Sequence, residues 1–442
     1  MTEHDAVDVP MESDRRFERS ANTITADTSS SATSSTTPEP VPSSQSQRGL
    51  DWFIFFLADL QTGFGPFVVV YLTTQKWTLT EIGLVLSIGG VVGLIGQMPG
   101  GAIIDAVRSE RLAGLAVATI GLVALAYAAW PIFPVIAIAA TLHAAASCVL
   151  GPAIAAISLG LVGPRAISER LGRNARFASL GNGSAAAVMG GIGYLFSSRM
   201  VFVVSFVFAV ATVLSLWQIR DREIDPEQAH GAVSRPPCDP GATSIFHLLR
   251  QRPLLIFAAI VLLLQLANAA MLPLMAGIVT ARSSASAPAL IAASIIVPQA
   301  MVALISPSVG RKAQSWGRRP LLMLACGALA LRGCLFSVTT DPSMLVVIQA
   351  LDGITAAVFG VMVPLIVADI TYGSGHFNLA QGVVGTATGI GASLSPALAG
   401  FASDHFGHDT AFMGLAAVAM IGLIVIWALM PETKMSLSRE PA

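Results

Sequence analysis

The chain has 442 residues, of which 54% are hydrophobic and only 12% are charged, about half the charged share of an ordinary soluble protein. Its 25 basic and 26 acidic residues leave a formal charge of −1, so no basic surface is available for a nucleic-acid backbone. This composition excludes a soluble enzyme, a disordered scaffold and a nucleic-acid binder. The four cysteines are too scattered for a disulfide framework or a metal site, so neither a metal nor a cofactor is expected.

Residues 1–49 form the one long polar stretch, with 12 of the charged residues and a Ser/Thr/Pro-rich run from Thr28 to Pro42. Such a composition cannot bury enough apolar surface to fold, so it predicts a disordered tail. A signal peptide has an apolar run followed by a small-residue cleavage site, and this stretch has no such run. The first membrane segment is therefore expected to act as its own insertion signal.

From Asp51 onward, apolar segments long enough to cross a membrane follow one another with short polar breaks. Lipid offers no hydrogen-bond partners to the backbone, and the alternation of a β-barrel is missing, so the segments are expected to be helices. The sequence predicts an all-α integral membrane protein with twelve transmembrane helices. The segments are 51–73, 81–104, 112–130, 134–162, 176–197, 200–219, 254–278, 288–309, 320–338, 342–370, 379–402 and 410–430.

The distribution of Lys and Arg predicts the orientation of these helices. With the tail in the cytoplasm, 21 of the 25 basic residues fall on the cytoplasmic side, and only Lys76, Arg199 and Arg282 on the outer side. Arg332 lies inside the membrane. The positive-inside rule therefore places both termini in the cytoplasm of a multi-pass protein of the cell (plasma) membrane.

A polar loop at 220–253, rich in charge, Pro and Gly, divides the segments six and six. The predicted organisation is a tail (1–49), a six-helix bundle (50–219), a cytoplasmic linker (220–253), a second six-helix bundle (254–431) and a cytoplasmic C-terminal tail (432–442). Two equal halves suggest a duplicated unit, of the kind that many transporters contain.

The loops after the second and eighth segments support this duplication. The first reads GAIIDAVRSER (residues 101–111), and the second reads GRKAQSWGRRP (residues 310–320), 209 residues later. His143 and Asp352 share that offset, as do Gly151 and Gly360. Several coincidences at one spacing indicate two related halves.

Through these loops the chain resembles the major facilitator superfamily of secondary transporters, over residues 51 to about 433. The family signature is Gly, three residues, Asp, a basic residue, one residue, Gly and two basic residues. Both copies depart from it: the first lacks the basic residue at Ala106, and the second has Gln314 in place of the acid. The resemblance implies a latch between the two halves on the cytoplasmic side, although the arginines are also explained by the positive-inside rule alone. The expected latch residues are Gly101, Asp105, Arg108, Arg111, Gly310, Gln314, Gly317, Arg318 and Arg319.

Ionisable side chains at membrane depth are costly, and each is a candidate functional residue. Asp59 and Gln61 lie in the first segment, before a Gly65–Pro66 pair that predicts a break or kink. The family resemblance implies that the first, fourth, seventh and tenth helices line a central cavity. A carboxyl there would favour its protonated form, so Asp59 is a candidate for proton coupling or else a structural, hydrogen-bonded residue.

Arg332 and Asp352 fall at similar depths in the ninth and tenth segments, which a short turn joins. We expect them to form a buried ion pair, because an unpaired charge at that depth would be very costly. Gln349 lies three residues before Asp352 and therefore on the same helical face. The pair is either structural or a place where a proton or substrate competes for Asp352.

Further polar residues complete one expected midplane site, formed by Gln265 and Asn268 on the seventh segment and His143 on the fourth. The expected function is secondary transport of a small organic solute by alternating access, as proton-coupled efflux, with proton-linked import of a metabolite as the alternative. A non-transporting receptor or lipid-handling protein on the same scaffold is the alternative from another class. No enzyme activity is expected, and the protein is expected to act as a monomer whose partners are the solute, protons and lipid.

Overall fold

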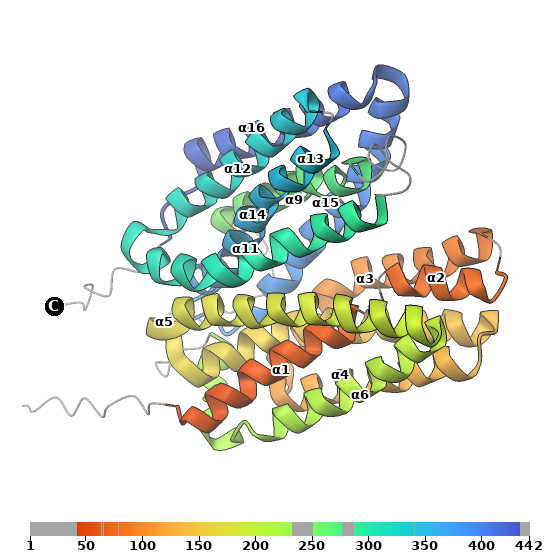
Figure 1. Ribbon diagram of the computed structural model, residues 1–442. Helices are drawn as coiled ribbons and strands as arrows, with labels where there is room; N and C mark the ends of the chain where they lie inside the picture. Colours follow the sequence, from red (N-terminus) through yellow and green to blue (C-terminus); the bar gives the residue numbers. More distant parts are fainter. Residues whose placement is uncertain are drawn as a thin grey trace, which may run out of the picture. The chain divides into compact units, whose positions relative to one another are not determined.

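The computed structural model describes residues 42–62, 64, 66–77, 79–231, 251–275, 287–339 and 341–433 (Figure 1). This part of the chain is helical and contains no strand. The long helices run in broadly the same direction, as apolar segments that cross one membrane must (Figure 1). The elements are α1 (Ser44–Thr62), α2 (Pro66–Thr74), α3 (Leu79–Ala106), α4 (Ser109–Ala129), α5 (Phe133–Leu195), α6 (Ser198–Trp217), the 3₁₀ turn η1 (Asp221–Glu223), α7 (Pro226–Ala229), α9 (Arg252–Asn268), α11 (Ala287–Trp316), α12 (Arg318–Val338), α13 (Pro342–Ile348), α14 (Ala350–Ile370), α15 (Phe377–Phe406) and α16 (His408–Leu429).

The predicted all-α membrane fold is confirmed. Among the described residues, nine helical runs are long and apolar enough to cross a membrane, and one of them, Phe133–Gly193, is long enough to cross twice. The pair α1–α2 and the more polar α15 coincide with the first and eleventh predicted segments. The structure is therefore consistent with twelve crossings.

Each half of the chain builds its own apolar core. Residues of α1, α3, α4, α5 and α6 form one cluster, which includes Phe53, Ile120 and Ala209. The larger cluster lies mostly in α9 to α16 and also takes in Leu171 of α5. Between the halves, α3 packs against α15 and α11 packs against α5. These two crossings carry most of the contacts between the halves, and α14 and α15 also touch α5.

The first helix is kinked where the sequence predicts, because α1 ends at Thr62 and α2 begins at Pro66. Its beginning differs from the prediction. The helix starts at Ser44, so the last residues of the predicted tail are helical. Ser43 explains this start: its hydroxyl accepts from the Ser46 backbone N–H at 3.2 Å and donates to Glu223 at 2.8 Å. Hydropathy alone misses this polar first turn, and residues 1–41 lie outside the described part.

The fourth and fifth predicted segments are two helices that together form α5 and meet at Gly163, whose φ of 70° and ψ of 173° are not helical. The polar break expected at 163–175 is therefore confined to this glycine, and the second helix begins earlier than predicted. Glycine adopts this left-handed φ at little cost, and Pro164 follows it as the first residue of a new helix, a position that proline favours. The charged residues after it lie on the helix and pair with α1, as described below.

The beginning of the predicted linker is also ordered. Asp225 caps α7 by accepting from the backbone N–H groups of Glu227 and Gln228, and its own N–H donates to the Gly160 carbonyl at 2.9 Å. The Gly231 carbonyl accepts from Gly373 N–H at 2.7 Å. These contacts tie residues 221–231 to both halves. The remainder of the predicted linker, 232–250, lies outside the described residues.

Candidate transport site and latch

Arg332 is the centre of a buried polar network in the second half. Its guanidinium is 1% exposed and donates to three oxygens: Asp352 Oδ1 at 2.6 Å, Asn268 Oδ1 at 2.7 Å and Gln349 Oε1 at 2.8 Å. Gln349 in turn donates to the Ser294 carbonyl at 3.3 Å. The expected pairing of Arg332 with Asp352 is present, and four helices contribute to the network.

Two local features place Asp352 in this network. The helix breaks at Gln349, between α13 and α14, so that Asp352 lies in the first turn of α14. One residue later, Gly353 packs directly on α11, where a Cβ would collide with Met301 and Pro298. The side chain of Asp352 is 22% exposed, whereas that of Arg332 is 1% exposed. The carboxylate is thus the accessible member of the pair.

Asp59 is buried in the first half and lies apart from this network. Its side chain is 1% exposed and accepts from the Ser184 hydroxyl of α5 at 3.0 Å. Gly181, one turn before Ser184, brings the two helices together, because a Cβ there would collide with the Phe55 carbonyl of α1. No Lys or Arg in the described part of the chain forms an ion pair with Asp59. This carboxyl is therefore held by a neutral hydroxyl in an apolar surrounding.

The remaining expected site residues are not gathered into one cluster. Gln61 is exposed, and Gln265 is half-buried without a hydrogen bond to any described residue. His143 does not join its repeat counterpart Asp352, and stacks instead on Phe64, with 4.1 Å between the ring centroids. The sequence places these residues on facing helices, but it does not determine which way each side chain turns.

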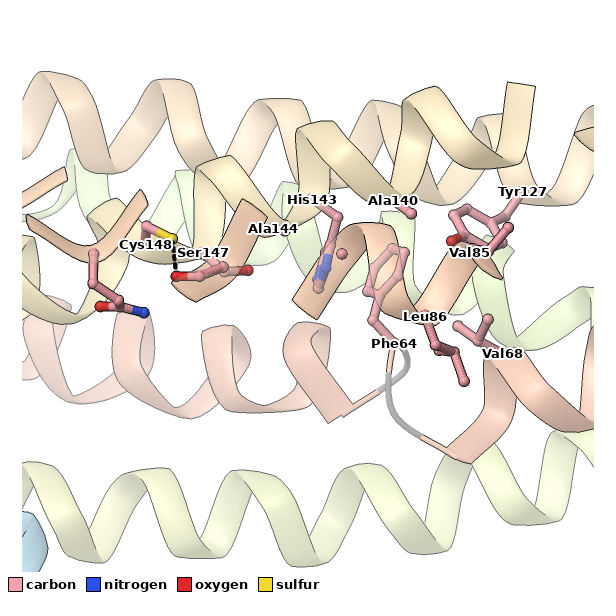
Figure 2. A pocket seen from close by; sticks show the side chains of 13 residues that line it. Phe64, Val68, Val85, Leu86, Tyr127, Ala140, His143, Ala144, Ser147 and Cys148 are labelled. Carbon is pink, nitrogen blue, oxygen red and sulfur yellow. Dashed lines mark hydrogen bonds between the residues drawn. The ribbon is translucent and has the colours of Figure 1, made fainter. Parts of the chain in front are cut away.

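His143 lines a cavity of about 310 Å³ that is formed entirely by the first half (Figure 2). The walls are mainly apolar, and the polar side chains among them belong to Gln97, Tyr127, His143 and Ser147. Two polar atoms here, His143 Nε2 and Ser147 Oγ, are buried without a hydrogen-bond partner among the described residues. Both residues that carry these atoms line the cavity.

Asp105 joins the halves at the end where α3 and α11 terminate, which we call the latch end. Its carboxylate accepts three hydrogen bonds from the start of α15: from Asn378 N–H at 3.1 Å, Asn378 Nδ2 at 2.8 Å and Leu379 N–H at 2.8 Å. The two backbone N–H groups belong to the first turn of α15, where they have no partner within the helix and where a negative charge is favoured. Gly101 makes the approach possible, since a Cβ would collide with the Asn378 carbonyl.

The second copy of the motif makes the equivalent crossing without a charge. Gly310 meets the Ser168 carbonyl of α5 just as Gly101 meets Asn378. Gln314 occupies the position of Asp105 and donates from Nε2 to the Arg165 carbonyl at 3.1 Å and to Ser168 Oγ at 2.7 Å. The duplication inferred from sequence is thus visible as two symmetric crossings.

The arginines of the motif do not bridge the halves. Arg108 and Arg111 are exposed and form no ion pair with any described residue, so their expected part in the latch stays a prediction. Arg318 pairs with Asp369 of α14 at 2.8 Å, and Arg319 donates to the Trp427 carbonyl. Gly317, with φ 95°, precedes α12. These contacts lie within the second half and strengthen its latch end.

One buried charge cluster was not anticipated. Asp51, 2% exposed, pairs with Arg170 at 2.7 Å and with Arg173. Arg170 also donates to Asn174, which donates to Ser158, each at 2.7 Å. By the predicted bounds, Asp51 begins the first segment, and Arg170, Arg173 and Asn174 fall in the polar break between the fourth and fifth segments. The signal that could have found them is the i, i+3, i+4 spacing of Arg170, Arg173 and Asn174, which places them on one helical face.

The fold and these sites define a multi-pass helical membrane protein of the transporter type, built from two related halves. The sequence profile of the Major Facilitator Superfamily matches residues 52–331 and 270–442. The chain is 38% identical over 393 residues to an "Uncharacterized MFS-type transporter" of Mycobacterium tuberculosis, which covers 87% of this chain and 93% of the relative. The chain therefore belongs to the Major Facilitator Superfamily, as its motifs predict.

More distant likenesses agree with this assignment. The tetracycline resistance protein, class B, of Escherichia coli is 28% identical over 134 residues, which are 30% of this chain and 33% of that protein. Among solved structures, a variant of the Escherichia coli fucose:proton symporter superposes with a TM-score of 0.65 at 15% identity, over 86% of this chain and 97% of the symporter chain. The same symporter in its outward conformation gives 0.68 at 13% identity, over 87% and 97%. At these identities, the likeness shows the fold alone.

Proposed function

We propose that the protein is a secondary active transporter that exports a small organic solute by alternating access, coupled to protons. The observation that carries this proposal is the buried carboxyl of Asp59, which has a neutral partner, Ser184, and no ion pair with a described cation. A carboxyl in such surroundings is stabilised by taking up a proton and releases it when water enters. Export is supported by the partial similarity to a tetracycline resistance protein.

The arrangement of the halves supports alternating access. All the close backbone crossings between them described above lie at the latch end, through Gly101 and Gly310. We propose that this end faces the cytoplasm, because the loops beside it carry the excess of Lys and Arg. Both termini are then cytoplasmic, and the protein has its latch closed on the inside. Opening inward requires these crossings to separate.

Proton coupling through Asp59 is tested by the variant Asp59→Asn. Asparagine keeps the size and the contact with Ser184 but cannot release a proton. In proteoliposomes we expect solute counterflow to persist, while solute movement driven by a pH gradient falls by about tenfold or more, a loss of at least about 1.4 kcal/mol of coupling. The solutes to measure are a panel of small neutral organic compounds, chosen by thermal stabilisation of the purified protein.

The matched control is Asp341→Asn, since Asp341 is an exposed cap of α13 and asparagine caps a helix equally well. Undiminished gradient-driven transport by Asp59→Asn would exclude this carboxyl from coupling. Solute movement with the proton rather than against it would identify import as the direction. Absence of counterflow for every solute would favour a non-transporting receptor.

A further inference from the structure

We propose that the cavity of the first half binds an uncharged, amphipathic organic molecule through a hydroxyl or amide group, which hydrogen-bonds to His143 and Ser147. The inference rests on the proposed transport function and deepens it, because it names the chemical class of the solute. The cavity volume of about 310 Å³ lies at the lower end for small-molecule sites, so one small ring system fits.

The apolar walls define the body of this molecule. Phe64, Val68, Val85, Leu86 and Ala140 line the cavity from α2, α3, α5 and the turn before α2, and no Asp, Glu, Lys or Arg is among the described lining residues. A charged solute would lose its water here without gaining a counter-ion, at a cost that no contact in the cavity offsets. The occupant is therefore neutral and mainly apolar.

Two unused polar atoms define its functional group. Helical Ser and Thr hydroxyls commonly donate to the carbonyl four residues earlier, as Thr141 does at 2.9 Å and Ser205 at 3.0 Å. Ser147 does not, and its Oγ is buried without a partner among the described residues. His143 Nε2, one turn earlier on the same helical face, is likewise buried without a partner among the described residues. A buried polar atom without a partner is costly, and a ligand that hydrogen-bonds to it removes that cost.

The ring of His143 is held in place for this role. It stacks on Phe64 at an interplanar angle of 25°, so one face of the ring is covered by an apolar side chain, while the ring nitrogens lie in the ring plane and point away from that contact (Figure 2). A neutral imidazole has one donor and one acceptor nitrogen, and a serine hydroxyl can do either. A hydroxyl or amide of the ligand can therefore satisfy both side chains in either histidine tautomer.

The cavity also touches the crossing between the halves. Gln97 lines it, and the Gln97 backbone packs so closely on Gly382 of α15 that a Cβ there would collide with it. The Gln97 amide lies beside Gly385, one turn further along α15. A ligand that contacts Gln97 thus reaches a residue of the α3–α15 contact, which must separate when the protein opens at the latch end.

The test is equilibrium binding to the purified full-length protein in one detergent, by isothermal titration, with three probes of similar size. Thymol carries a phenolic hydroxyl, cymene is the same skeleton without it, and cuminate carries a carboxylate. We expect thymol to bind about tenfold more tightly than cymene, the value of roughly one buried hydrogen bond, and cuminate not to bind.

Three variants locate the site. His143→Leu is expected to weaken thymol about tenfold and to leave cymene unchanged. Gly93→Leu is expected to abolish binding of both, because Gly93 lines the cavity and its Cβ would meet open space. Gly90→Leu is the matched control, on the same helix and equally unobstructed but outside the cavity lining. Gly90→Leu should bind thymol and cymene as tightly as the unmodified protein does. Thermal unfolding of each variant shows that it is folded.

Three results would overturn the proposal: binding of cuminate as tight as that of thymol, thymol binding unchanged in Gly93→Leu, or no binding of thymol at all. These outcomes are independent of the proton-coupling test, which measures flux and not equilibrium binding. Thymol binding without proton-driven transport would contradict the transport proposal alone. Proton-driven transport without thymol binding would contradict the binding site alone.

Discussion

Replacing Arg332 with leucine is expected to lower the free energy of unfolding by about 3–5 kcal/mol, the usual cost of removing one partner from a buried ion pair. The change removes the counter-ion of Asp352. It also removes the guanidinium that donates to Asn268 Oδ1 and Gln349 Oε1. Thermal unfolding of the purified protein in detergent measures the effect as a fall in Tm of several degrees.

A second variant separates the charge from the packing. The double change Arg332→Leu with Asp352→Leu removes both charges, so it should recover a large part of the lost stability, because an apolar pair often replaces a buried ion pair without loss. Arg108→Leu is the control: Arg108 is exposed and has no ion pair with a described residue, so its change should stay within about 0.5 kcal/mol. A double variant less stable than Arg332→Leu would show that Asp352 is stabilised by something other than the arginine.

The pair itself was accessible from the sequence because membrane depth restricts the choices. Counting residues inward from the short turn between two segments brings Arg332 and Asp352 to one level, and the cost of an unpaired charge leaves pairing as the solution. The twelve apolar segments could be predicted for a similar reason: within lipid, a single segment satisfies all its backbone hydrogen bonds only as an α-helix. Physical constraints that exclude alternatives make good predictors.

The other features of the site could not be predicted, because they depend on side-chain orientation and on which charged residues are buried. Arg170 was interpreted as a loop charge because a hydropathy pattern treats every charge as the edge of a segment. In the structure it lies on α5 and is 4% exposed, paired with Asp51. His143 shares its repeat position with Asp352, yet its ring stacks on Phe64 and does not join the Arg332 network. Repeats preserve backbone positions more faithfully than side-chain environments.

The two copies of the motif illustrate the same difference. Their glycines make the same backbone crossing, but Asp105 offers a full negative charge to the start of α15, whereas Gln314 offers a neutral amide to α5. Hydrogen bonds to a charged group are roughly twice as strong as neutral ones. The α3–α15 crossing is therefore held by charge-assisted hydrogen bonds, whereas the α11–α5 crossing is held by neutral ones, from Gln314 to Ser168 and from Ser179 to Gln299.

The largest conformational effect is expected from Gly101→Ala. The added Cβ would collide with the Asn378 backbone carbonyl, which is fixed in α15 and cannot give way as a flexible side chain could. The halves must then separate at the latch end, and the hydrogen bonds of Asp105 to Asn378 and Leu379 are lost with the contact. Their loss alone is worth about 1–3 kcal/mol, or roughly 5- to 150-fold in the ratio of open to closed protein.

The separation can be measured as a distance between spin labels at Arg108→Cys and Ser374→Cys, on opposite sides of this crossing, in protein whose native cysteines are replaced. Gly101→Ala should shift the distance distribution to longer values, and Asp105→Asn should do so to a smaller extent, because the amide keeps one acceptor oxygen. Gly90→Ala adds the same methyl group to α3 where nothing lies within 4 Å, and it should leave the distribution unchanged. An unchanged distribution in Gly101→Ala would mean that α15 can shift without opening the latch end, and Asp105 would then be a helix cap and not a latch.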